Sequence, residues 1–299
     1  MELFSPVYYK EFKCIADKCR HSCCVNWEIA VDDETLSSYR RDGRDDILRH
    51  ISVTEDGAEI VLFQDGRCPF LDGCGLCRII SEKGESYVSK ICREHPRFYH
   101  RIGGICEVGI GAVCEEAARL ILSEENFSEL EVIGEHEKCA ADETDFDTLS
   151  YRKEIFKWLS DKVMSYRDKI CGIAEKYGVA DRLSEDFSFV FSELEYLEEE
   201  NLSLFEVGRK EERPRMQELA LRFLAYLIFR HVSVATEEDN LRARVGFCLL
   251  LLGIFENATA LLSSPTLSDA VDIARRISSE IEYSEENTAA LIFEFECSI

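Results

Sequence analysis

The sequence has no apolar run long enough to cross a lipid bilayer. Its longest nearly continuous apolar stretch runs from Val245 to Phe255, well short of the roughly 20 residues that a transmembrane helix needs. The first residues, Met1 to Pro6, carry neither the basic region nor the apolar core of a signal peptide. These absences predict a cytoplasmic protein with no membrane partner, in a compartment where thiols stay reduced.

Positive charge is also scarce. The 299 residues include 35 Lys and Arg against 59 Asp and Glu, which gives a formal net charge of −24. Such a chain is repelled by phosphate backbones, so the composition argues against nucleic acid as a partner. The deficit is uneven, because residues 1–122 have a net charge of −5 and residues 123–299 have a net charge of −19. This asymmetry predicts two unlike parts.

Cysteine, by contrast, is abundant. Of 14 cysteines, 11 precede residue 140, and four of these lie between Cys14 and Cys24. Thiols at this density pair as disulfides, or they bind a soft metal or an iron–sulfur cluster. Buried free thiols are the third alternative. The expected reducing compartment disfavours disulfides, and the crowding disfavours ordinary core cysteines, so the pattern favours metal ligation.

The periodicity of apolar residues predicts a mainly α protein of the α+β class. Asp32 or Asp33 is expected to cap a helix that ends at Gly43, and residues 51–65 are typical of a hairpin. Because Pro96 restricts His95, we expect no helix across this point. Longer helices are expected over residues 112–122, 151–177, 214–227, 241–262 and 268–281.

These patterns predict two domains and a connector. Residues 1–122 would form a small cysteine-rich, cluster-binding domain that contains the hairpin, and residues 148–299 a helical bundle. The acidic stretch at residues 123–147 would connect them. The aromatic residues within 1–13 are expected to pack beneath the first cysteines.

Most of the cysteines belong to ordered motifs, and these motifs carry a resemblance to a known family. The chain resembles the flagellin lysine N-methylases, a branch of the bacterial proteins that have a cysteine-rich, zinc- or iron-chelating domain. The match covers roughly residues 6–122. The matching motifs are Cys14-Ile15-x3-Cys19-x3-Cys23-Cys24-x2-Trp27-x-Ile29-x2-Asp32, Cys68-Pro69-Phe70-Leu71-Asp72, Gly75-Leu76-Cys77, Cys92-x2-His95-Pro96-Arg97 and Cys114-Glu115-Glu116-Ala117-Ala118-Arg119.

The resemblance implies S-adenosylmethionine-dependent methylation of lysine ε-amino groups on flagellin, in the cytoplasm before export. It also implies an iron–sulfur cluster, [4Fe–4S] in the first instance, with zinc as the alternative. Cys114 matches a cysteine of the methylase branch, whereas Cys74 and Cys106 match no motif. Core or surface thiols are expected at Cys139, Cys171, Cys248 and Cys297. The implied metal ligands are Cys14, Cys19, Cys23, Cys24, Cys68, Cys77 and Cys92.

The chemistry of lysine methylation suggests further candidates, although no residue is singled out as catalytic. The substrate ammonium must lose its proton, and acidic or tyrosine side chains would attract the cation. Each candidate has an alternative interpretation as an ordinary packed or solvated side chain. The candidates are Tyr87, Glu94, Tyr99 and Glu107.

Two other stretches invite a cofactor interpretation. Residues 107–112 resemble the acidic-x-Gly-x-Gly loop of common methyltransferases, but no βαβ pattern follows, which indicates a chance match. The basic stretch from Arg93 to Arg101 follows Cys92 directly. It could hold a cofactor carboxylate or offset the charge of a thiolate cluster, or it could make ordinary salt bridges. A second function also stays open, a non-catalytic module in which zinc or iron staples the fold.

Overall fold

The computed structural model describes residues 1–102, 104–135, 146–205 and 214–297, so Cys139 lies outside the described residues. The chain divides into two compact units. Lys13–Arg97 form one, which we call the cysteine unit. Met1–Phe12 and Phe98–Ile299 form the other, which we call the helical unit.

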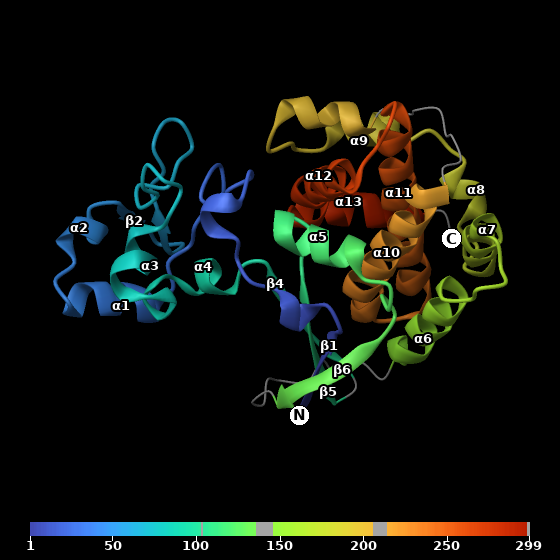
Figure 1. Ribbon diagram of the computed structural model, residues 1–299, viewed down its shortest axis with the longest axis horizontal. Coiled ribbons are helices and arrows are strands. Elements are labelled where there is room, and N and C mark those ends of the chain that lie inside the picture. The colour runs from blue at the N-terminus through green and yellow to red at the C-terminus, as the bar shows by residue number, and fades with distance from the viewer. Residues whose placement is uncertain (103, 136–145, 206–213, 298–299) are drawn as a thin grey trace. The chain divides into compact units, whose positions relative to one another are not determined.

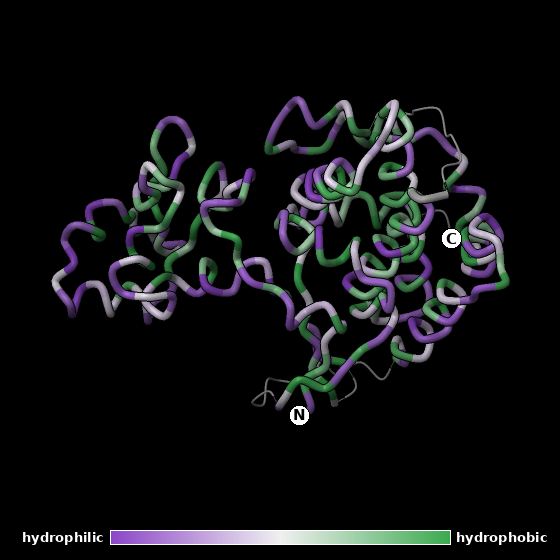
Figure 2. The backbone as a smooth tube through the Cα atoms, in the orientation of Figure 1, coloured by the Kyte–Doolittle hydropathy of each residue, from purple (hydrophilic) through white to green (hydrophobic). Residues whose placement is uncertain are grey.

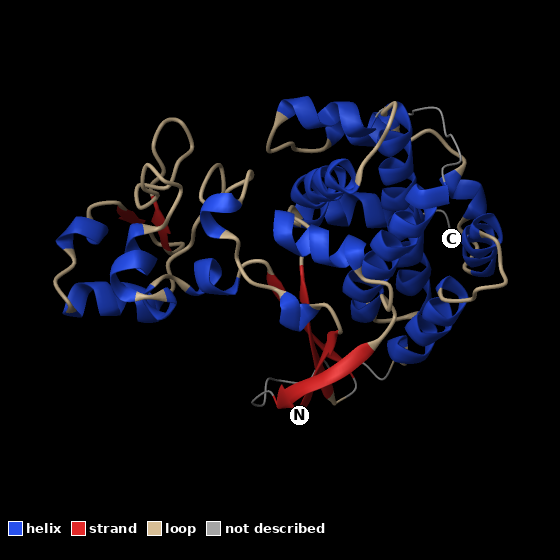
Figure 3. Cartoon of the chain, in the orientation of Figure 1, coloured by secondary structure: helices blue, strands red, loops and turns tan. Residues whose placement is uncertain are grey.

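The cysteine unit is built from short elements joined by long loops (Figure 3). Its hairpin is confirmed, since β2 and β3 pair antiparallel with Ile51 opposite Ile60. The first helix begins as expected, because the Asp32 side chain accepts a hydrogen bond from the Thr35 backbone N–H at 2.9 Å. The elements are α1 Asp33–Arg41, α2 Asp45–Leu48, β2 Ile51–Val53, β3 Ala58–Ile60, α3 Arg78–Lys83 and α4 Lys90–Glu94.

The helical unit combines a small mixed sheet with a helical core (Figure 1). The strand order is β4-β5-β1-β6, with β1 parallel to β5 and antiparallel to β6. The strands are β1 Glu2–Pro6, β4 Arg97–Ile102, β5 Ile105–Ile110 and β6 Leu130–Glu135. The helices are α5 Glu115–Ser123, α6 Thr148–Leu159, α7 Tyr166–Lys176, α8 Ala180–Leu183, α9 Ser188–Glu193, α10 Pro214–His231, α11 Glu238–Leu261, α12 Leu267–Ile277 and α13 Glu285–Glu296.

The core of the helical unit lies along α10 and α11. Phe223, Phe247 and Phe255 are fully buried there, and hydrophobic segments gather in this interior (Figure 2). Among the described residues, α11 is the one helix long and apolar enough to cross a membrane, and most of its surface is buried within the protein. That burial is typical of the core helix of a soluble protein.

The observed division differs from the expected boundary at residue 122. Residues 1–12 do not belong with the cysteine unit, because β1 pairs with β5 and β6 of the helical unit. Residues 98–122 join that unit for the same reason. The expected acidic connector contains β6, and its residues 136–145 lie outside the described part of the chain.

One expected helix was wrong. The stretch 151–177 forms two helices, α6 and α7, because side chains between them satisfy the backbone locally. Asp161 accepts from the N–H groups of Val163 and Met164 at 2.7 and 2.9 Å. Ser165 then caps α7 by accepting from the Asp168 N–H at 3.1 Å. The expected starts at Pro214 and, through a Thr266 capping box, near Ser268 are confirmed.

Candidate metal centre

Backbone pairing places Cys24 beside Cys68, although the two are distant in sequence. The Cys68 N–H donates to the Cys24 carbonyl at 2.8 Å, and the Asn26 N–H donates to the Gly66 carbonyl at 2.9 Å. Gly66 has φ +77°, and a Cβ there would lie 1.8 Å from Asn26 Oδ1. Glycine is therefore required at this crossing, which aligns the two thiol-bearing segments.

A tight loop then brings Cys77 back beside the segment that follows Cys68. Asp72 Oδ1 accepts from the Cys74 and Leu76 N–H groups at 2.8 and 2.9 Å, an arrangement typical of an Asx turn. A bridge between Leu71 and Cys77 closes the loop. In the sequence, Asp72 stands out only as part of a motif. Its structural role is indicated by its place just before the Gly73-Cys74-Gly75 run.

Cys92 comes from a third segment, α4, whose start is tied to α1. The Lys90 N–H donates to Asp32 Oδ2 at 2.8 Å, and the same carboxylate accepts from the Thr35 side chain at 2.9 Å. Asp32 thus holds the first turns of both helices. This link, which spans 58 residues of sequence, was missed by the sequence analysis because local patterns identify Asp32 only as a cap.

Four thiols, those of Cys24, Cys68, Cys77 and Cys92, act on one another electrostatically. Burial, with contributions from negative charge at the other three, raises the pKa of Cys68 to about 12. Desolvation likewise raises the pKa of Cys92 to about 11, with contributions from Cys24 and Cys77. Such contributions require proximity, because the interaction weakens with distance. The four side chains therefore share one neighbourhood.

Hydrogen-bond donors accompany these sulfurs. The pKa of Cys77 is raised by burial, while the backbone N–H groups of Ile80 and Ile79 act in the opposite direction. The Phe70 N–H likewise acts to lower the pKa of Cys68. A hydrogen bond with Cys23 lowers the pKa of Cys24 to about 7 against an opposing effect of burial. These groups favour the thiolate, the form that binds a metal.

The four thiols have the chemistry that a metal requires. Their side chains are not arranged as a complete metal site. Within the described residues, no three His, Cys, Asp or Glu side chains are placed to hold a metal ion. Four sulfurs from three short segments match the donor set that both zinc and iron–sulfur clusters prefer.

The other cysteines named from the sequence do not belong to this group of four. Cys23 touches the group through its hydrogen bond with Cys24, whereas Cys14 and Cys19 flank a 3₁₀ turn at Ala16–Lys18. Their role as ligands stays a prediction. Cys74 is exposed on its loop. Cys106, Cys114, Cys171, Cys248 and Cys297 lie in the helical unit.

The candidate groups for lysine chemistry are divided between the two units. Tyr87 donates to Asp42 at 2.8 Å and Glu94 ends α4, both in the cysteine unit. Tyr99 is exposed on β4. Glu107 is fully buried in an ion pair with Arg152, a partnership 45 residues apart in sequence that the sequence analysis did not find.

Residues 107–112, which resemble a methyltransferase glycine loop, lie in and just after β5 and pack against side chains. A Cβ on Gly109 would lie 2.3 Å from the ring of Phe98, and one on Gly111 would lie 2.2 Å from the Tyr283 hydroxyl. These glycines therefore admit neighbouring side chains of the helical unit. The basic stretch is divided as well, since Arg93 lies in the cysteine unit and His100 is buried in the helical unit beside Phe229.

Comparisons with known proteins give three similar sequences. The lysine-N-methylases of Salmonella typhimurium and Salmonella choleraesuis are each 28% identical over 128 residues, which cover 40% of this chain and 32% of theirs. The flagellar biosynthetic protein FliU of Salmonella muenchen is 27% identical over 128 residues, 76% of its length.

The chain thus matches about a third of the length of the two lysine-N-methylases. No family model matches the sequence, and no solved structure matches it. The relatives nevertheless agree with the motif resemblance drawn from the cysteines. On this basis the chain is similar to the flagellin lysine N-methylase family.

Proposed function

We propose that this protein methylates lysine side chains of flagellin in the cytoplasm, with S-adenosylmethionine as methyl donor and an iron–sulfur cluster held by Cys24, Cys68, Cys77 and Cys92. The observation that carries the proposal is the convergence of these four thiols in a chain similar to proteins named lysine-N-methylase. Because the similarity spans part of each protein, activity and substrate are both proposals.

The residues of the cysteine unit have defined tasks in this proposal. The four thiolates would bind the cluster, and the backbone N–H groups of Phe70, Ile79 and Ile80 would offset their negative charge. Asp32 would position Cys92 by holding the start of α4. When bound, the cluster supplies a rigid centre that ties three loops together. Zinc in the same four thiolates is the alternative metal.

The methyl transfer itself sets requirements for the protein. The lysine ammonium must lose its proton to a base, after which its nitrogen forms a bond to the methyl carbon while the carbon–sulfur bond of the donor breaks, with the electron pair remaining on sulfur. The net charge of −24 favours the approach of a cationic lysine segment, because opposite charges speed encounter.

Intact-mass measurement of flagellin tests the activity. Purified, unmodified flagellin is incubated with anaerobically prepared protein and S-adenosylmethionine. We expect mass increases in steps of one methylene, which Cys77→Ser abolishes and Cys74→Ser retains, since Cys74 is exposed and lies outside the group of four. Unchanged flagellin mass with metal-loaded wild-type protein would contradict the proposal.

A non-catalytic role is the second candidate. The cysteine unit has a small apolar core, so a metal that only staples the fold would account for the same thiols. Iron, zinc and sulfide analysis of anaerobically purified protein separates the two metals. Iron with sulfide supports the cluster. Stoichiometric zinc together with unmodified flagellin would favour the staple.

A further inference from the structure

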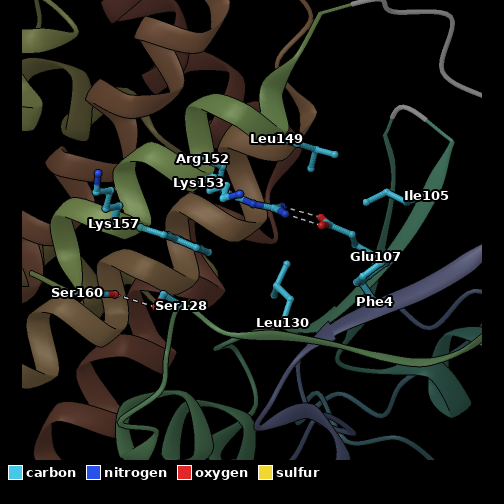
Figure 4. Close-up of a pocket in the computed structure, with 11 residues that line it drawn as sticks. Phe4, Ile105, Glu107, Ser128, Leu130, Leu149, Arg152, Lys153, Lys157 and Ser160 are labelled. Carbon is cyan, nitrogen blue, oxygen red and sulfur yellow. Dashed lines mark hydrogen bonds and ion pairs between the residues drawn. The ribbon is translucent and has the colours of Figure 1, made fainter.

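A pocket lies in the helical unit, and no cysteine is among its lining residues. It has a volume of about 520 Å³ and opens between α6 and the face of the sheet that carries Phe4 and Glu107 (Figure 4). These two residues are neighbours in the register of the adjacent parallel strands β1 and β5. The volume is in the range of sites that hold small organic molecules.

One face of α6 forms the other wall. Leu149, Arg152, Phe156 and Ser160 line the pocket and recur at helical spacing, together with Lys153 and Lys157. Ser160 and Ser128 join at the end of this wall, with their hydroxyl oxygens 2.8 Å apart. The lining thus combines the rings of Phe4 and Phe156 with a few polar groups, a composition typical of ligand sites.

A buried ion pair forms the polar part of this lining. Arg152 donates to the two carboxylate oxygens of Glu107 at 2.6 and 2.5 Å, and the exposed fractions of the two side chains are 5% and 0%. Arg152 also donates to Ser233 and lies 5.1 Å from the ring centre of Phe229. These bonds use three of its five N–H groups, and no described residue accepts from the other two.

Two lysines add net positive charge to this lining. Lys153 and Lys157 are exposed and one helical turn apart, and neither makes an ion pair with a described residue. Since Arg152 and Glu107 offset each other, the lysines give the pocket lining a net positive charge in a chain whose net charge is −24. A local reversal of charge beside a low-dielectric cavity attracts anions.

We propose that this pocket binds a nucleoside-sized organic anion, with its ring system between the apolar walls of the sheet and α6 and its carboxylate or phosphate held by Lys153 and Lys157. All of the pocket's lining residues belong to the helical unit.

Three probes that share one ring system test the charge requirement. Adenosine 5′-monophosphate carries a phosphate, S-adenosylhomocysteine carries a carboxylate, and adenosine carries no anion. Isothermal titration of the full chain should show binding of at least one anionic probe about tenfold tighter than adenosine, the ratio that about 1.4 kcal/mol provides. Equal affinity for all three, or no binding of any, would overturn the proposal.

Matched variants locate the binding. The double variant Lys153→Gln and Lys157→Gln should remove the preference for the anionic probe, while Lys162→Gln, an exposed lysine beyond the end of α6, should preserve it. Ser160→Phe should weaken all three probes because it fills the pocket from the exposed end of the helix. Unchanged affinities in both pocket variants would overturn the assignment.

The two anionic arms distinguish the source of the charge. Preference for S-adenosylhomocysteine would make this the site of the methyl donor, a result that rests on the proposed function. Preference for adenosine 5′-monophosphate would indicate a separate phosphate ligand. Because binding is measured without flagellin, a failure of methylation and a failure of this pocket give different results.

Discussion

The two units of this protein are stabilised in different ways. The helical unit buries large aromatic side chains such as Phe223, Phe247 and Phe255 along α10 and α11. The cysteine unit has a modest apolar core around Ile47 and Phe70, and its elements are short. Burial of apolar area is the main source of folding free energy, so the smaller unit has much less of it.

Under the proposed function, this contrast gives the thiols a stabilising role in the cysteine unit and not in the helical unit. Small units with few apolar contacts usually need disulfides or a metal. In the helical unit, Cys248 is an ordinary buried side chain of α11. In the cysteine unit, four thiols stand where separate loops meet. We therefore expect the two units to respond differently to the same perturbations.

Metal removal should give the largest difference. Binding of a structural metal is worth on the order of 10 kcal/mol, more than a small unit can replace. Hydrogen exchange measured by mass spectrometry before and after chelation should show loss of protection throughout Lys13–Arg97 and retained protection in α10 and α11. Identical exchange of the cysteine unit in both states would contradict this expectation.

Breaking the buried ion pair should affect the helical unit alone. Arg152→Ala leaves Glu107 charged and buried without its partner, and such a loss costs about 3–5 kcal/mol. Urea unfolding of the helical unit reports this change. The double variant Arg152→Met and Glu107→Leu should recover much of the free energy of unfolding. A single variant as stable as the wild type would show that the pair is dispensable.

Acid should also destabilise the helical unit through His100. Burial lowers the pKa of His100 to about 3, with help from Arg152 and Arg230, and its Nδ1 atom has no hydrogen-bond partner among the described residues. The unfolded chain binds this proton below pH 6.5, whereas the folded chain does not. Stability is therefore complete above pH 6.5 and falls by roughly 1.4 kcal/mol per pH unit toward pH 3.

The variant His100→Phe should reduce that slope, because a ring of similar size between Phe98 and Phe229 has no proton to bind. Urea unfolding at pH 7, 6 and 5 compares the two proteins. Above pH 5 the Glu282 carboxyl adds little, since burial is outweighed by Arg230, His231 and Ser278 together and its pKa falls to about 2. Parallel pH profiles for wild type and variant would refute the assignment to His100.

The smallest effect should come from one glycine in the cysteine unit. Gly66→Ala introduces a Cβ at φ +77° against Asn26, so we expect a loss of about 1–3 kcal/mol and a weaker metal site. Gly73→Ala is the matched control, because its Cβ would meet nothing within 4 Å and its φ is not positive. Thermal unfolding that ranks the two variants equally would argue against a special role for the crossing.

Local patterns predicted local structure well. The cap at Asp32, the hairpin at Ile51–Ile60, the helix from Pro214 and the buried α11 all follow from residues near one another in sequence. The break after Leu159 was missed because the apolar spacing continues through it. Only the bonds of Asp161 and Ser165 show that the helix stops there.

Long-range partnerships explain the remaining differences. The unit boundary depends on β1 pairing with β5, about one hundred residues later, and no local pattern carries that information. The same is true of Glu107 with Arg152. Cysteine spacing identified a set of candidate ligands, but which thiols meet depends on how Cys24 pairs with Cys68. The motif alone therefore does not distinguish the cysteines that come together in the fold from those that do not.

We propose above that Cys24, Cys68, Cys77 and Cys92 bind one metal centre. Native mass spectrometry of anaerobically purified wild-type protein, Cys77→Ser and Cys74→Ser tests it most directly. We predict one metal centre per chain in the wild type and in Cys74→Ser, and its loss in Cys77→Ser. Wild-type protein without metal, or equal metal content in the two variants, would contradict the account.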